Sequence, residues 1–143
     1  MIGAMADKDL VSMLRGVPLF AKLSDKDLKR LSNNLTERSF PAGHEVAHEG
    51  SEGVGFFVIE EGQATVRKSG EEVRKLGPGD YFGEMALIDQ GPRSATVVAD
   101  SELRCRGMTA WAFRPFVESH GEVAWSLMEA LVIRLREAEG MRP

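Results

Sequence analysis

The residues best suited to chemistry lie in one stretch of the chain, residues 77–96. Gly83 permits close backbone approach before an expected single turn of helix over residues 84–88, and Arg93 follows a short loop with glycine and proline. The start of a helix presents unpaired N–H groups and the positive end of the helix dipole, and an arginine offers a fork of donors. The pattern therefore predicts a phosphate held between this helix start and Arg93.

Glu84 lies where that anion is expected, which is a poor place for a carboxylate if phosphate is the whole ligand. A carboxylate there makes sense if the ligand also presents a hydroxyl, as a ribose does. Taken singly, Glu84 can instead balance the helix dipole, and Arg93 can be a solvated loop cation. Because Glu84 and Arg93 occur together at this spacing, a nucleotide-like ligand is favoured.

The order Phe-Gly-Glu, a small apolar run and then Pro-Arg-x-Ala resembles the phosphate-binding cassette of the cyclic nucleotide-binding domain family. That family occurs in bacterial cAMP-receptor regulators, cyclic-nucleotide-dependent kinases and gated channels. The resemblance implies that Glu84 accepts the ribose 2′-hydroxyl and that Arg93 pairs with the cyclic phosphate. The ligand-binding residues it implies are Phe82, Gly83, Glu84, Met85, Ala86, Arg93, Ser94 and Ala95.

Ser94 bears on which cyclic nucleotide is bound. By resemblance, this position often holds alanine in cAMP-selective sites, threonine in cGMP-selective sites and serine in bacterial cAMP receptors, so cAMP is expected over cGMP. The barrel wall and the last helix are expected to contact the base, and the candidates on that helix are Trp125, Met128, Leu131 and Val132. Core packing of an amphipathic helix explains these four side chains equally well.

The elements that must position this site follow from the hydrophobic pattern. Residues 7–35 read as helical, with Ser24 as an N-cap. Ten of the fifteen glycines fall between residues 43 and 91, among short β-rich segments, which predicts an antiparallel β-barrel or jelly roll over residues 36–108. Thr109 caps a return to helix, and apolar residues at helical period continue to about residue 139. The fold class is mainly β with flanking helices.

The resemblance covers nearly the whole chain. Pro18-Leu19-Phe20 followed by Leu23-Ser24 is similar to the N-terminal helical segment of the family, and residues 109–139 resemble its hinge and C-terminal helices. A length of 143 residues has room for one domain. We therefore expect residues 1–143 to form a single cyclic nucleotide-binding domain, with the cassette at residues 82–95.

Composition and other motifs exclude several functions. A net charge of −4 argues against a nonspecific grip on nucleic acid. No signal peptide or membrane-length apolar run is present, and Cys105 alone cannot form an internal disulfide, so a soluble cytoplasmic chain is expected. His44 to His48 matches the HExxH zinc pattern, but in a β-rich region the two histidines would lie about 13 Å apart. We predict no enzyme activity, no catalytic or metal-ligating residue and no cofactor.

The sequence thus predicts a regulatory module that binds cAMP, or less readily cGMP, and repositions its C-terminal helices in response. An effector protein or domain is expected, since the sequence stops about where its last helix does. A homodimer through that helix is a further expectation. The alternative is a protein-interaction or dimerisation subunit that has the same fold and binds no nucleotide.

Overall fold

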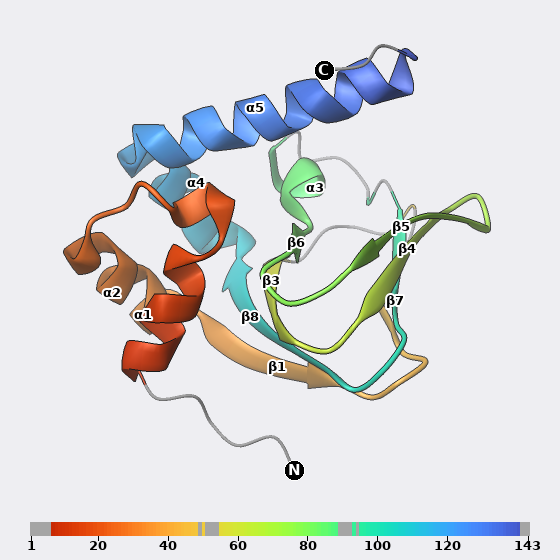
Figure 1. Cartoon of the computed structure of the whole chain (residues 1–143), viewed down its shortest axis with the longest axis horizontal. Helices are drawn as coiled ribbons and strands as arrows, with labels where there is room; N and C mark the ends of the chain where they lie inside the picture. Colours follow the sequence, from red (N-terminus) through yellow and green to blue (C-terminus); the bar gives the residue numbers. More distant parts are fainter. Residues whose placement is uncertain (1–6, 49, 51–54, 89–92, 94, 141–143) are drawn as a thin grey trace.

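The computed structural model describes residues 7–48, 50, 55–88, 93 and 95–140. The chain runs from helices through strands and back to helices, in the predicted order (Figure 1). The first helices are α1 (Asp7–Arg15), the 3-10 helix η1 (Pro18–Phe20) and α2 (Asp25–Asn34). The hydroxyl of Ser24 accepts a hydrogen bond from the Asp27 backbone N–H at 3.2 Å, which is the N-cap that the sequence predicts.

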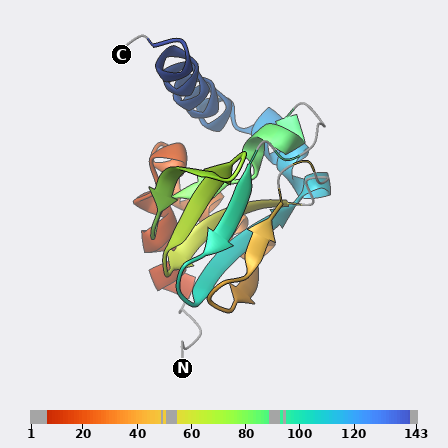
Figure 2. The same ribbon diagram turned by 90° about the vertical axis from the view of Figure 1, so that its right-hand side faces the viewer.

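Within the described residues, eight strands form two antiparallel sheets. The strands are β1 (Thr36–Phe40), β2 (Glu45–Ala47), β3 (Gly55–Glu61), β4 (Ala64–Lys68), β5 (Glu71–Leu76), β6 (Tyr81–Phe82), β7 (Thr96–Ala99) and β8 (Leu103–Thr109). Their order is β1-β8-β3-β6 in one sheet and β2-β7-β4-β5 in the other. The predicted jelly roll with flanking helices is confirmed, although the described strands make two sheets and no closed barrel (Figure 2).

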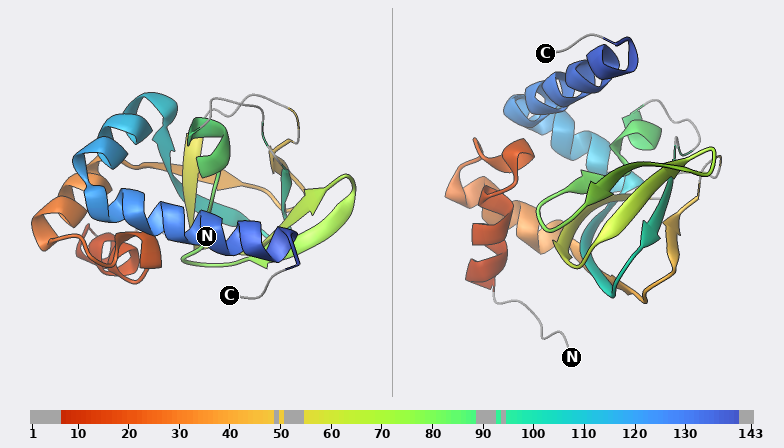
Figure 3. Two further views of the ribbon diagram at one scale, coloured as in Figure 1. Left: turned by 90° about the horizontal axis from the view of Figure 1, so that it is seen from above. Right: turned by 45° about the vertical axis from the view of Figure 1, so that its right-hand side comes forward.

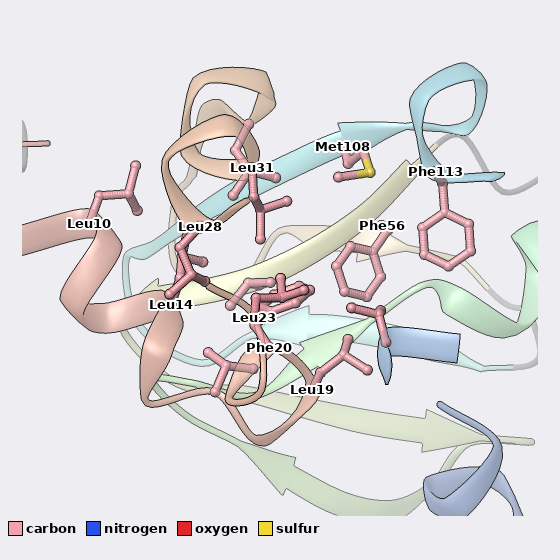
Figure 4. Close-up of a cluster of buried hydrophobic side chains, with 14 of the residues drawn as sticks. Leu10, Leu14, Leu19, Phe20, Leu23, Leu28, Leu31, Phe56, Met108 and Phe113 are labelled. Atoms are coloured by element: carbon pink, nitrogen blue, oxygen red, sulfur yellow. The ribbon is translucent and has the colours of Figure 1, made fainter. Parts of the chain in front are cut away.

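Strand β3 joins two hydrophobic cores because its side chains alternate between its faces. Phe57 and Ile59 face the second sheet and pack with residues of β4 and β7. Phe56 and Val58 face the helices, where Phe56 contacts Phe20 at 6.4 Å and Phe113 at 5.3 Å between ring centroids. Figure 4 shows these rings with the leucines of α1 and α2 in this core. These contacts fix the N-terminal helices to β3 and therefore to its sheet, whose strand β6 is followed by the candidate site.

Three helices follow the strands or interrupt them: α3 (Glu84–Ile88), α4 (Ala110–Ser119) and α5 (Gly121–Ala138). The Thr109 hydroxyl accepts a hydrogen bond from the Ala112 N–H at 3.3 Å and caps α4, as predicted. Helix α5 is anchored in the core by Val123 and Leu127, and its second half runs past α3 toward β5 (Figures 1 and 3). No helix in the described residues is long and apolar enough to cross a membrane.

Candidate functional site

A cavity of about 720 Å³ lies between the second sheet, α3 and the second half of α5. This volume is within the range of small-molecule sites. Sheet residues on one side and helical residues on the other enclose it. The lining residues are Ala47, Val66, Lys68, Val73, Arg74, Phe82, Gly83, Glu84, Met85, Arg93, Ala95, Val97, Leu131, Arg134, Leu135, Glu137 and Ala138.

Glu84 begins α3 with its side chain almost fully buried, at 4% exposure. Its Oε1 accepts a hydrogen bond from Arg134 Nη1 of α5 at 2.7 Å. Its Oε2 is also buried and has no hydrogen-bond partner. A buried carboxylate oxygen without a donor is costly, so this atom is poised to accept a hydrogen bond from a ligand.

Arg93 is the second buried charge at the cavity, at 6% exposure. Its Nη2 donates to the Gly55 carbonyl oxygen at 2.9 Å, while its Nη1 is buried without a partner. Burial lowers the pKa of Arg93 from its ordinary value, and the nearby Glu84 carboxylate acts in the opposite direction. In the part of the chain that the structure describes, the bond to Gly55 holds one end of the guanidinium, and Nη1 is offered to an anion.

Gly83 lets these two charges share the cavity. Its φ of +97° lies in the left-handed region, which other residues rarely adopt. A Cβ at this position would lie 2.5 Å from both Arg93 Nη1 and the Gly55 carbonyl oxygen. Glycine is therefore required for the backbone to turn into α3 this close to the arginine.

The structure brings together most of the predicted ligand-binding residues. Those that line the cavity are Phe82, Gly83, Glu84, Met85, Arg93 and Ala95. Ala86 belongs to α3, and Ser94 lies outside the described residues.

Of the four candidates for contact with the base, only Leu131 lines the cavity. Trp125, Met128 and Val132 are 61%, 49% and 45% exposed, so they belong neither to the cavity nor to the core. The interpretation of these three as core residues is wrong, because they lie on the part of α5 that faces solvent, whereas Leu131 and Arg134 of the same helix face the cavity.

Two cavity arginines were not identified from sequence. Arg134 lies seven residues after Leu127 and three after Leu131, so its place on the buried face of α5 could have been found from helical periodicity. Arg74 lies in β5, where charged neighbours make it resemble a surface residue. Its Nε is nevertheless buried without a partner.

The zinc-like motif has no metal-binding geometry. His44 and His48 flank the short strand β2 instead of sharing a helical face, as predicted. The described residues contain no group of three or more histidine, cysteine, aspartate or glutamate side chains that could hold a metal ion. The charged side chains that line the cavity are two acidic ones, Glu84 and Glu137, and four basic ones, Lys68, Arg74, Arg93 and Arg134.

Comparison with known proteins gives one family. A family model for the cyclic nucleotide-binding domain matches residues 37–120. A cAMP-dependent protein kinase regulatory subunit from Mycosarcoma maydis is 45% identical over 109 residues, which are 70% of this chain and 21% of that protein. The chain thus spans about a fifth of the length of this relative.

Solved structures agree with this result. A structure described as cAMP bound PfPKA-R has a TM-score of 0.83 at 23% identity, with 94% of this chain and 48% of that chain covered, and shows the same fold. Thermus thermophilus catabolite activator protein has a TM-score of 0.78 at 30% identity, with 85% and 60% covered.

Proposed function

The chain belongs to the cyclic nucleotide-binding domain family, and from this premise we propose that the cavity beside α3 binds a cyclic nucleotide. One observation carries the proposal. Arg93 Nη1 and Glu84 Oε2 are both buried without partners at the same cavity, which suits a ligand with one anionic group and one nearby hydroxyl. A cyclic ribose phosphate has both groups. In this proposal Arg93 binds the phosphate and Glu84 accepts the 2′-hydroxyl.

The proposed ligand is cAMP in preference to cGMP. Support comes from the family resemblance at Ser94 and from the relatives, one named a cAMP-dependent kinase subunit and one described as cAMP bound. Calorimetric titration of the chain with cAMP and with cGMP measures this preference.

Binding is proposed to reposition α5 through Glu84. The two oxygens of this carboxylate differ, because Arg134 Nη1 of α5 donates to Oε1 at 2.7 Å while Oε2 has no partner. A ligand hydroxyl on Oε2 would fix the carboxylate in the orientation that Arg134 needs. The ligand would then bind with higher affinity when Arg134 holds α5 against α3 than when this contact is broken. Such a difference in affinity is the condition for a ligand-driven shift.

Thermal unfolding tests the proposed ligand class. Since a ligand that binds only the folded chain stabilises it, millimolar cAMP or cGMP should raise the unfolding midpoint, whereas 5′-AMP, which lacks the ring phosphodiester, should raise it less. If neither cyclic nucleotide changes the midpoint, the alternative of an interaction subunit without a nucleotide replaces this proposal.

We propose that the repositioning of α5 regulates a partner protein. The kinase relative suggests a protein kinase as one class of effector. Pull-down of the chain with a kinase catalytic subunit, with and without cAMP, tests this assignment, and binding that ignores cAMP contradicts it.

A further inference from the structure

The second half of α5 has little buried surface to hold it over the cavity. The first half is anchored by the buried side chains of Val123 and Leu127. Within the described part of the helix, no residue after Leu127 is buried. Arg134 Nη1 donates to Glu84 Oε1 at 2.7 Å, and this bond joins the second half of α5 to α3. A further charge close to this bond will therefore affect how firmly the second half is docked.

Arg74 of β5 is such a charge, and it has the same sign as Arg134. Both side chains line the cavity together with Glu84. The Nε of Arg74 is buried and, among the described residues, has no hydrogen-bond partner. An unpaired buried donor is costly, so the presence of Arg74 at this place calls for an explanation other than stability.

The charges around Arg74 do not compensate for its burial. Burial lowers the pKa of Arg74, and the positive charge of Arg134 has the next largest effect and lowers it further. Glu84, Tyr81 and Asp80 raise it, each by less. Glu84 is also shared, because its Oε1 already accepts a hydrogen bond from Arg134. Arg74 and Arg134 thus repel each other and compete for one carboxylate.

The cavity as a whole has the same excess of positive charge. Four basic and two acidic side chains line it in the part of the chain that the structure describes. A cyclic phosphate brings one negative charge into this cavity. Because that charge attracts both guanidinium groups, a bound anion lowers the free energy needed to hold Arg134 near Arg74.

We propose that Arg74 is a repulsive charge that opposes the docking of Arg134 on Glu84, and that an anionic ligand relieves this repulsion. Arg74 thereby makes the docking of the second half of α5 depend on the ligand. It acts through Arg134 and needs no contact with the ligand. The effect of the ligand rests on the proposed function, whereas the repulsion itself does not.

Amide hydrogen exchange of the ligand-free chain tests the repulsion. Arg74→Gln and Arg74→Met both remove the charge, and each should slow exchange in the second half of α5 by at least about threefold, as for two coupled charges in one network. Arg74→Lys keeps the charge and should exchange as the unmutated chain does. Arg67→Gln removes an exposed charge of the neighbouring strand β4 and should change nothing in α5.

A double-mutant cycle with Arg134→Gln separates this repulsion from a purely structural effect of Arg74. In the Arg134→Gln background the two neutral Arg74 substitutions should leave exchange in α5 unchanged, because the charge that they relieve is gone. The same slowing in both backgrounds would overturn the proposal. So would unchanged or faster exchange when Arg134 is present.

Addition of millimolar cAMP tests the role of the ligand. It should slow exchange in the second half of α5 by a larger factor in the unmutated chain than in Arg74→Gln, and an equal factor in both would overturn the proposed relief. If calorimetry detects no binding of cAMP or cGMP by the unmutated chain, the proposed function is wrong. The ligand-free comparison then decides by itself whether Arg74 repels Arg134.

Discussion

Gly83 illustrates how much of the proposed site depends on one missing side chain. The glycine brings the backbone before α3 close to both Arg93 and Gly55. We expect Gly83→Ala to lower the free energy of unfolding by about 1–3 kcal/mol, because alanine must either adopt a strained φ or displace the buried guanidinium. Urea unfolding measures this loss.

Gly121→Ala is the matched control for Gly83. A Cβ at Gly121 meets nothing within 4 Å and needs no positive φ, so this variant should unfold at the same urea concentration or a higher one. A loss of stability as large as that of Gly83→Ala would mean that the contact with Arg93 has no special role.

Cys105 predicts a dependence of stability on alkaline pH. Burial, and to a lesser degree Glu60, raises the pKa of its thiol from 9.0 to about 12. In the unfolded chain the thiol ionises near its ordinary pKa, while in the folded chain it stays neutral. Stability from this residue is therefore complete below about pH 9 and is lost as the pH rises toward about 12.

Urea unfolding at about pH 8 and about pH 10.5 measures that loss. Cys105→Ala should show a smaller decrease between the two conditions than the unmutated chain. Part of the decrease should remain, because burial also raises the pKa of Tyr81, with Glu84 adding to the effect. If Cys105→Ala and the unmutated chain lost the same stability between the two pH values, the raised pKa assigned to Cys105 would be contradicted.

At the scale of elements, the contact between α3 and α5 is the proposed coupling. Arg134 Nη1 of α5 lies 2.7 Å from Glu84 Oε1 of α3, and the two side chains are 29% and 4% exposed. Cyclic nucleotide should slow amide hydrogen exchange in the second half of α5, and Arg134→Ala should remove this protection. Arg136→Ala changes an exposed arginine of the same helix and should keep it. Equal protection in both variants would show that the coupling does not pass through Arg134.

The elements themselves were largely predictable from sequence. The helices could be predicted from leucines at helical period and the strands from short segments separated by glycines. The caps at Ser24 and Thr109 could be predicted because an N-cap bonds to a backbone N–H only a few residues away. The direction in which α5 runs after Leu127 depends on tertiary contacts that no local pattern encodes. Leu131 was found among the candidates for the base, and Arg134 could have been added from the same helical period. Arg74 was missed because its charged neighbours in β5 resemble those of a surface strand.

At the scale of the whole molecule, the exposed face of α5 favours self-association. Trp125, Met128, Val132 and Ile133 are each at least 45% exposed on this helix. Large exposed apolar groups gathered on one element are typical of an interaction surface. We predict a homodimer by analytical ultracentrifugation, and a monomer for Trp125→Glu. A monomeric unmutated chain at high micromolar concentration would contradict the prediction.

The single-domain organisation of residues 1–143 stays a proposal at this scale. The hydrophobic core shared by α1, α2, β3 and α4 supports it, because these elements bury side chains against one another. Limited proteolysis should leave one resistant fragment that contains both the N-terminal helices and β8. Separate stable fragments for helices and strands would contradict it.

The central claim is that Arg93 binds the phosphate of a cyclic nucleotide beside Glu84, and calorimetric titration tests it most directly. We predict that the unmutated chain binds cAMP with a Kd of about 10 μM or tighter. Arg93→Ala should bind it at least about thirtyfold more weakly, as expected when a buried charge pair loses one partner, while Arg67→Ala binds as the unmutated chain does. Equal affinities of Arg93→Ala and the unmutated chain, or no binding by the latter, would contradict the account.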